Sequence, residues 1–177
     1  MNYEGYFDYA SATPASEAVL AAMMPYFSGS FHNPSAIYDA AERVRQSMEE
    51  ARRSTALTLG VKPQTIIWTS GCTEANNLAI HGIMRLYPDA KVLFSAVEHD
   101  SVRRPAESYD HHVLPVNANG VIDIDRLESM LSDDVVLVSI MYANNEVGSV
   151  QPLREVSQII AKVREKRGEG GLPIYLH

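Results

Sequence analysis

The chain has 177 residues and a formal net charge of −7, and 46% of its residues are hydrophobic and 21% charged. These proportions are typical of a globular chain with a buried core, and they exclude a disordered or fibrous protein. The length suits one domain or a large part of a bigger one. Acidic and basic residues are interspersed, so no basic stripe is present for nucleic acid to bind.

The chain contains one cysteine, Cys72. This excludes a disulfide framework within the chain and a zinc site built on several thiolates, so we predict no metal site and a reducing compartment. Residues 1–7 lack the basic start and apolar run of a secretory signal, and no stretch approaches 18 uncharged apolar residues. We expect a cytoplasmic protein that does not act at a membrane.

The first 60 residues predict two helices. Thr13 and Pro14 suit the N-cap and first position of a short helix, which Pro25 interrupts. Apolar and small residues at helical spacing among charges predict a second helix over 36–59. Gly60 then ends it, as glycine does after many helices.

After residue 60, short apolar runs alternate with helical patterns. The predicted strands are 65–69, 91–96, 112–116, 135–141 and 174–176. The predicted helices between them are 73–86, 101–108, 123–131 and 153–167. The apolar run that begins at Val135 is typical of a strand buried on both faces. This alternation predicts an α/β fold, with a mostly parallel sheet covered by helices on both faces.

The strand predicted over 174–176 has no helix after it in this sequence. An uncovered apolar sheet edge promotes association, so we expect an interrupted domain that is found with a partner. The alternative is a natural edge strand at the C-terminus.

Polar segments follow three of the predicted strands, at the edge of the sheet where ligands bind in open α/β folds. The turn and helix start over 70–77 suit a phosphate, or they only cap the helix. His99 could stack on a flat ring or transfer a proton, or it makes only local hydrogen bonds. Asn144, Asn145 and Glu146 could orient a polar ligand, although Asn is also a common turn residue.

Taken in order, these segments resemble the cysteine desulfurase branch of the class V aminotransferases, which are pyridoxal phosphate (PLP) enzymes. The matching segments are 7–14, 33–35, 69–80, 98–99 and 144–148 with Gln151. The resemblance implies a three-layer sheet, the large PLP-binding domain of fold type I aminotransferases, incomplete at the C-terminus. It also implies an N-terminal segment, 1–30, that packs toward the small domain or the active-site entrance, and a first part of the large domain over 31–177.

The resemblance also implies roles for individual residues. Cys72 and Thr73 would hold the PLP phosphate through the backbone and the hydroxyl. His99 would stack on the pyridine ring and act as a catalytic residue in proton transfer. Asn145 would hydrogen-bond the 3-hydroxyl oxygen of the ring, and Asn33 would lie near the substrate carboxylate.

The implied activity is removal of sulfur from L-cysteine, which gives alanine and an enzyme persulfide and supplies sulfur for iron–sulfur cluster assembly. In the family, the Schiff-base lysine follows the segment that resembles 174–177, so we expect the isolated chain to be inactive. The implied partner is a chain carrying the missing half, or a second copy in a homodimer. The alternatives are a selenocysteine lyase or another class V aminotransferase, or a non-enzymatic half-domain that acts as an interaction module.

Overall fold

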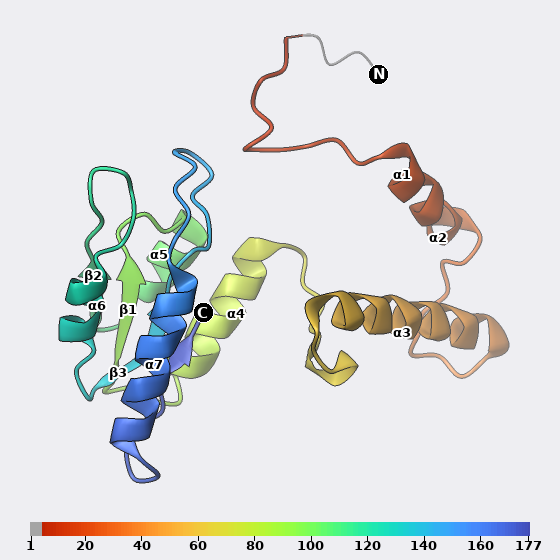
Figure 1. The fold of residues 1–177 in the computed structure, drawn as a ribbon. Coiled ribbons are helices and arrows are strands. Elements are labelled where there is room, and N and C mark those ends of the chain that lie inside the picture. The colour runs from red at the N-terminus through yellow and green to blue at the C-terminus, as the bar shows by residue number, and fades with distance from the viewer. Residues whose placement is uncertain (1–4) are drawn as a thin grey trace. The chain divides into compact units, whose positions relative to one another are not determined.

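The computed structural model describes residues 5–177 and divides into two compact units, Met1–Trp68 and Thr69–His177 (Figure 1). The predicted boundary after residue 30 stays a prediction. Within residues 5–177, no helix is both long enough and apolar enough to cross a membrane.

Over residues 5–68, the first unit contains three α-helices and one short 3-10 helix: α1 (Glu17–Met23), α2 (Pro25–Ser28), α3 (Asp39–Leu59) and η1 (Pro63–Thr65). Helix α1 starts later than the sequence predicts from Thr13 and Pro14. Ser16 is its N-cap, because the Ser16 Oγ accepts a hydrogen bond from the Val19 N–H at 3.3 Å. Glu17 adds a negative charge in the first turn, which the helix dipole favours.

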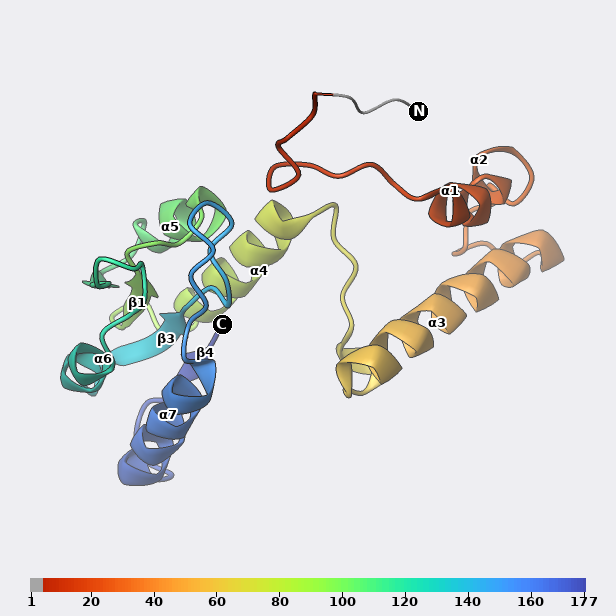
Figure 2. The same ribbon diagram turned by 45° about the horizontal axis from the view of Figure 1, so that its top comes forward.

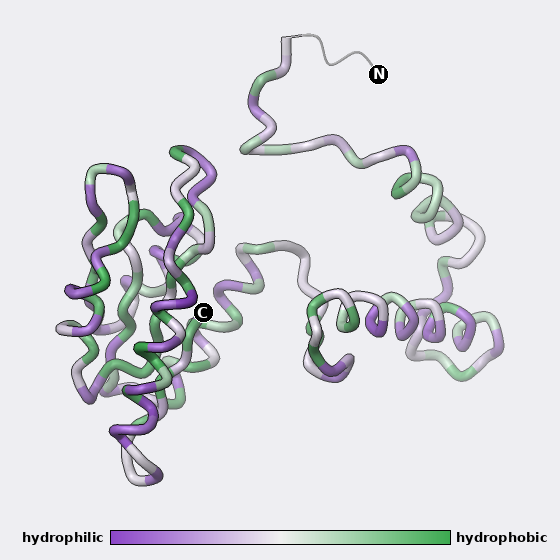
Figure 3. Tube along the Cα trace, viewed as in Figure 1, coloured by the Kyte–Doolittle hydropathy of each residue, from purple (hydrophilic) through white to green (hydrophobic). Residues whose placement is uncertain are grey.

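Helix α3 is amphipathic and ends where the sequence predicts. Figure 3 shows hydrophilic and hydrophobic residues alternating along it. It begins at Asp39, three residues later than predicted, and its buried residues are Ala41, Val44 and Ala56. Gly60 follows in the left-handed conformation, with φ 66°, and its N–H bonds the carbonyl oxygens of the last turn.

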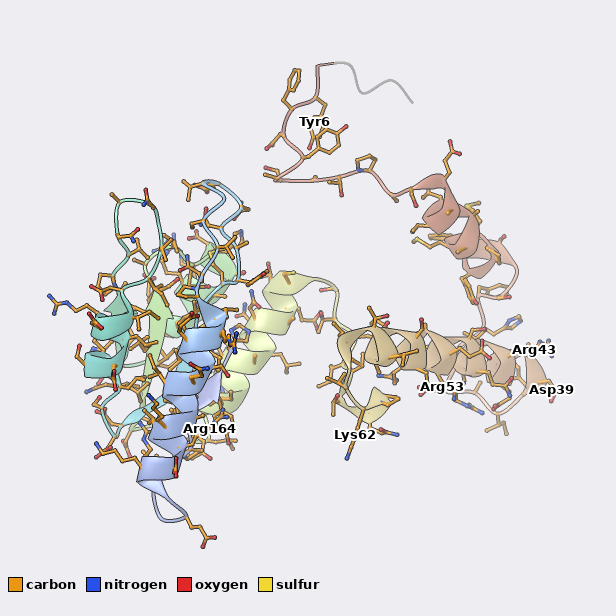
Figure 4. The ribbon with its side chains drawn as sticks, viewed as in Figure 1. Tyr6, Asp39, Arg43, Arg53, Lys62 and Arg164 are labelled. Carbon is orange, nitrogen blue, oxygen red and sulfur yellow. The ribbon has the colours of Figure 1, made fainter. Side chains whose placement is uncertain are left out.

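The strand predicted over 65–69 is wrong. Pro63–Thr65 form η1 instead, and residues 66–69 pair with no strand among the described residues. Arg52 of α3 donates a hydrogen bond to the Ile66 carbonyl oxygen, and the Ile67 side chain is 70% exposed. The backbone groups of a strand need a neighbouring strand as hydrogen-bond partner. In this segment, a side chain of helix α3 provides a hydrogen bond to the backbone. The Lys62 side chain, just before η1, points away from the ribbon (Figure 4).

The second unit is built on a parallel sheet. Its strands are β1 (Lys91–Ser95), β2 (His111–Leu114), β3 (Val135–Ser139) and β4 (Tyr175–Leu176), in the order β2-β1-β3-β4. Val92 of β1 pairs with His111 on one side and Leu137 on the other, and Leu137 pairs with Tyr175. Four of the five predicted strands are confirmed, each within a few residues of its predicted ends.

Two helices cover each face of this sheet. They are α4 (Cys72–Met84), α5 (Asp100–Ala106), α6 (Ile124–Met130) and α7 (Leu153–Arg167). Ile80 of α4 and Val102 of α5 pack with Phe94 of β1 on one face. Leu127 of α6 and Ile160 of α7 pack in a second cluster on the other face. Figure 2 shows α4 and α5 on one side of the strands and α6 and α7 on the other, so the predicted three-layer α/β fold is confirmed.

Strand β3 lies at the centre of the core. All five of its residues are buried; Val135 and Val138 belong to one cluster, and Val136 and Leu137 belong to the other. This is the burial predicted from its unbroken apolar run. Arg164 of α7 donates from Nε to the Ile174 carbonyl oxygen at 2.9 Å, which ties α7 to the segment entering β4 (Figure 4).

Candidate functional site

The loops that follow β1 and β3 are bound to each other where these strands end. The Met141 N–H donates to Glu98 Oε1 at 2.6 Å, and Asn144 Nδ2 donates to the Val97 carbonyl oxygen at 3.2 Å. Parallel strands end at the same edge of the sheet, so both loops lie at the edge where open α/β sheets bind ligands. The two hydrogen bonds fix the spacing of the loops that carry the candidate side chains.

The Glu98 carboxylate is the centre of this connection. It is half-buried, and the Ser95 hydroxyl donates to the same oxygen, Oε1, at 2.7 Å. Burial raises the pKa of Glu98, and the hydrogen bonds from Ser95 and Met141 offset part of that rise. The carboxylate therefore serves as an acceptor for both strand ends at the cost of its own desolvation.

His99 lies at the start of α5 and lines two neighbouring cavities. One cavity, of about 550 Å³, lies between the two loops and is also lined by Asn145 and Glu146. The other, of about 460 Å³, lies between α4 and α5 and is also lined by Thr73. The structure thus brings His99 together with Thr73 on one side and with Asn145 on the other.

The two asparagines that follow β3 have different surroundings. Asn144 is occupied by the fold, because its Oδ1 accepts from the N–H groups of Glu146 and Val147, each at 2.9 Å. Both asparagines line the cavity that they share with His99, but Asn145 is exposed, whereas Asn144 is only partly exposed. Of the pair, Asn145 is therefore the better candidate for contact with a ligand.

Helix α4 presents its N-terminus beside these residues. Cys72 and Thr73 are its first two residues, and both are exposed. Helix geometry leaves the N–H groups of the first turn without acceptors inside the helix. The Glu74 carboxylate accepts from the Ser70 N–H at 2.6 Å, and the hydrogen bonding from Ser70 lowers the pKa of Glu74. Cys72 has a free thiol, and it is not a lining residue of either cavity that His99 lines.

Asn33 belongs to the other compact unit. Its Oδ1 accepts from the Ser35 N–H at 3.0 Å, an arrangement that orders its own turn. Its suggested place near the substrate carboxylate stays a prediction.

Three further residues form hydrogen bonds at this site, and the sequence assigns none of them a role. Glu98 joins the two loops, while Ser101 and Asn76 form hydrogen bonds behind the His99 ring. Ser101 follows His99 by two positions, a spacing at which a side chain and a backbone N–H can bond at a helix start. Asn76 carries no such local signal, because its partner lies 25 positions away.

The donors gathered here suit a phosphorylated aromatic molecule. Free N–H groups at a helix N-terminus and the Thr73 hydroxyl are suited to a phosphate. The exposed imidazole of His99 offers a flat face, and the Asn145 amide offers a donor and an acceptor for a ring substituent. PLP has this combination of phosphate, aromatic ring and ring oxygen, so the residues present fit it.

Comparison with known proteins agrees with this chemistry. The family model for Aminotransferase class-V matches residues 5–166. The chain is 40% identical over 162 residues to cysteine desulfurase IscS 1 of Archaeoglobus fulgidus, covering 88% of this chain and 42% of that relative. It is also 40% identical over 166 residues to cysteine desulfurase IscS of Dictyoglomus turgidum, covering 90% of this chain and 42% of that relative.

Solved structures give the same result for the fold. A NifS-like protein superposes with a TM-score of 0.89 at 28% identity, covering 97% of this chain and 47% of that one. A structure described as SspA in complex with cysteine gives a TM-score of 0.83 at 35% identity, covering 89% and 48%. The chain thus spans less than half the length of each of these relatives.

Proposed function

This chain belongs to the class V aminotransferase family, and from this premise we propose that it supplies the cofactor-binding N-terminal part of a PLP-dependent cysteine desulfurase. The observation that carries the proposal is the placement of His99, which lines one cavity with Thr73 and the next with Asn145. These three residues come from different segments of the chain. If each of the three only stabilised its own segment, nothing would require them to line adjoining cavities.

We assign the phosphate to the N-terminus of α4. The backbone N–H groups of Cys72 and Thr73, together with the Thr73 hydroxyl, would donate to it. The Cys72 thiol has no part in this role, because only the backbone N–H of Cys72 would contact the phosphate. Glu74 would help indirectly, because its carboxylate holds the Ser70 N–H and so orders the turn before the helix.

We assign the ring to the space bounded by His99 and Asn145. The imidazole would stack on the ring and exclude water from one of its faces, and the Asn145 amide would donate to the ring oxygen. When bound, PLP supplies an electron sink that stabilises negative charge next to the substrate amino group.

We propose L-cysteine as the substrate. The names of the two curated relatives support this choice, and one similar structure is described as a complex with cysteine. Asn33 remains our candidate for a group near the substrate carboxylate.

The Thr73 hydroxyl provides the direct test of the phosphate site. We expect Thr73→Ala to weaken PLP binding about 10- to 100-fold, because a hydrogen bond to a charged group contributes about 1.5–3 kcal/mol. Binding is measured by titrating PLP into the protein and following the cofactor absorbance. Thr58→Ala, an exposed threonine in α3, is the matched control and leaves the affinity unchanged. Equal affinities for the two variants would show that Thr73 is only a helix residue and would count against the site.

We also propose that the protein associates, either as a homodimer or with a chain carrying the remaining half, and that it is cytoplasmic. The exposed apolar side chains of the first unit, such as Phe7, Phe27 and Phe31, support association. Size-exclusion chromatography with light scattering measures it. A stable monomer of 19.6 kDa at micromolar concentration would contradict association.

A further inference from the structure

The His99 ring is held from behind by hydrogen bonds that continue into α4. Its Nδ1 lies 3.0 Å from the Ser101 backbone nitrogen and 2.8 Å from the Ser101 Oγ. The Ser101 Oγ in turn lies 2.8 Å from the Asn76 Nδ2. Ser101 is buried, with 7% of its surface exposed, so these contacts are partly shielded from solvent. Asn76, Ser101 and His99 therefore form one continuous chain of hydrogen bonds.

Each hydrogen bond in this chain has only one possible direction. The Ser101 backbone N–H can only donate, so His99 Nδ1 must accept and cannot carry a proton. The Asn76 amide NH₂ donates to the Ser101 Oγ. The hydroxyl has a single hydrogen, which is left to donate to His99 Nδ1. A neutral His99 therefore carries its proton on Nε2, the ring nitrogen on the side away from Ser101.

We propose that Asn76 and Ser101 are positioning residues that fix the tautomer and orientation of His99. They present Nε2–H as a donor on the side of the ring away from Ser101. This rests on the proposed function for its consequence: His99 offers a hydrogen bond from Nε2–H to a bound ligand, and Nε2 of the neutral ring cannot accept a proton because it already carries one. In this arrangement the neutral ring acts as a donor and a stacking surface, and not as a base.

Helix capping alone does not account for the whole chain of contacts. The bond from the Ser101 N–H to His99 Nδ1 is sufficient to cap α5. The bond from Asn76 adds nothing to that cap, since it comes from α4. It sets the direction of the Ser101 hydroxyl, and it links the helix that carries Thr73 to the ring of His99.

The tautomer can be measured without cofactor or substrate. The full chain is labelled with ¹⁵N-histidine, and long-range ¹H–¹⁵N correlation spectra at neutral pH give the tautomer of each imidazole. We expect His99 to be in the Nε2–H form with at least about a tenfold excess over the other neutral form. His81 and His111, which also have a hydrogen-bond partner at Nδ1, provide internal references for correct folding.

Two variants test the positioning residues separately. Ser101→Ala removes the hydroxyl and keeps the backbone N–H, so the excess should fall about fivefold, the effect of one hydrogen bond. Asn76→Asp replaces the donor by an acceptor, which draws the Ser101 hydroxyl away from His99 and should lower the excess as well. Ser129→Ala on α6 and Asn119→Asp in a turn make the same chemical changes elsewhere, and both should leave the His99 tautomer unchanged.

The outcomes separate this proposal from the proposed function. A His99 in the Nδ1–H form, or an unchanged tautomer ratio in both Ser101→Ala and Asn76→Asp, would overturn the positioning role. Loss of the tautomer preference in these two variants alone would support it, whether or not the protein binds PLP. If PLP does not bind while the tautomer behaves as expected, only the proposed function fails.

Discussion

At the end of the sheet where β1 and β3 begin, the Lys91 Nζ lies 2.7 Å from the Asp134 carboxylate and 3.9 Å from that of Asp110. At the other end, the same two strands are joined by one half-buried carboxylate, Glu98, which accepts two hydrogen bonds. The first connection is ionic and faces water, since the side chains of Asp134 and Asp110 are 40% and 68% exposed. The second uses a single carboxylate that is only partly exposed to water.

The difference shows that the same two strands are joined at very different cost at their two ends. Exposed ion pairs contribute little each and cost little to maintain. A carboxylate taken out of water lowers stability unless its hydrogen bonds compensate for the lost solvation. Glu98 is placed where it joins the loops of His99 and Asn145, so its desolvation cost falls at the end of the sheet where we propose that the ligand binds.

The largest expected effect comes from removing the acceptor at the site end. Glu98→Ala leaves the Ser95 hydroxyl and the Met141 N–H without their acceptor, whereas Glu98→Gln can keep both bonds through Oε1. We expect the alanine variant to be less stable than the glutamine variant by about 2–4 kcal/mol, since each unsatisfied buried donor costs about 1–3 kcal/mol. Urea unfolding measures the free energies. Equal stabilities would show that water replaces the carboxylate and that the connection is weak.

A comparison of the wild type with Glu98→Gln gives the sign of the pH dependence. The native pKa of Glu98 is raised above its ordinary value, so the folded protein binds this proton more tightly than the unfolded chain does. The contribution of Glu98 to stability is therefore full below the unfolded pKa and is lost as the pH rises through the native pKa. Glu98→Gln should lack this decline, and its advantage over the wild type should grow with pH and then level off.

A smaller effect on stability is expected from a substitution in the turn between α7 and β4. A Cβ on Gly171 would lie 2.7 Å from the Arg167 Cβ and 2.8 Å from its carbonyl oxygen, whereas a Cβ on Gly170 would meet nothing within 4 Å. Arg167 donates from Nη1 to the Val135 carbonyl oxygen at 2.9 Å, so a shift of this turn also disturbs the start of β3. Gly171→Ala should lower the free energy of unfolding by about 1–3 kcal/mol.

Gly170→Ala is the matched control for this turn. Thermal unfolding of the two variants should show a lower midpoint for Gly171→Ala alone. A loss of similar size in both would mean that glycine flexibility, and not the close approach to Arg167, decides the stability of the turn.

The smallest effect is expected at the ionic end itself. The hydrogen bond from Lys91 lowers the pKa of Asp134 to about 2. Because this pKa lies below the unfolded value, the contribution of Asp134 is present at neutral pH and is lost as the pH falls toward 2. Asp134→Asn should cost less than about 1 kcal/mol at pH 7, given the exposure of the pair. When the free energy of unfolding is measured at decreasing pH, the difference between Asp134→Asn and the wild type should shrink. Asp133→Asn, at an exposed neighbouring residue, is the control and should have the stability of the wild type.

The elements that could be predicted from the sequence are those whose signals are local. Helix α7, over 153–167, was predicted to the residue, because its apolar spacing is regular and Gly168 follows it. The segment at 65–69 looked like a strand because Ile66, Ile67 and Trp68 are apolar and β-prone. A strand forms only when a neighbouring strand pairs with it, however. No local pattern shows that the Arg52 side chain will donate a hydrogen bond to the Ile66 carbonyl oxygen.

The candidate site divides in the same way. Thr73, His99 and Asn145 could be selected because each follows an apolar run or opens a helix, and the family resemblance singled out the same residues. Asn76 could not, because its role depends on a contact between α4 and α5 that links residues 25 positions apart. Side chains that position another side chain through contacts between helices are identified from the packed structure, because a local sequence pattern does not show contacts between distant segments.

The order of the strands has a consequence for how this unit folds. Val92 of β1 pairs with His111 only 19 positions later (111 − 92), but with Leu137 45 positions later (137 − 92). Closing the longer loop costs more chain entropy, and contacts between distant segments form slowly. The bond from Met141 to Glu98 depends on that distant pairing, so the loops of His99 and Asn145 reach their final spacing late. A ligand held between them binds only chains in which β1 and β3 have already paired, and its binding free energy therefore adds to that of folding.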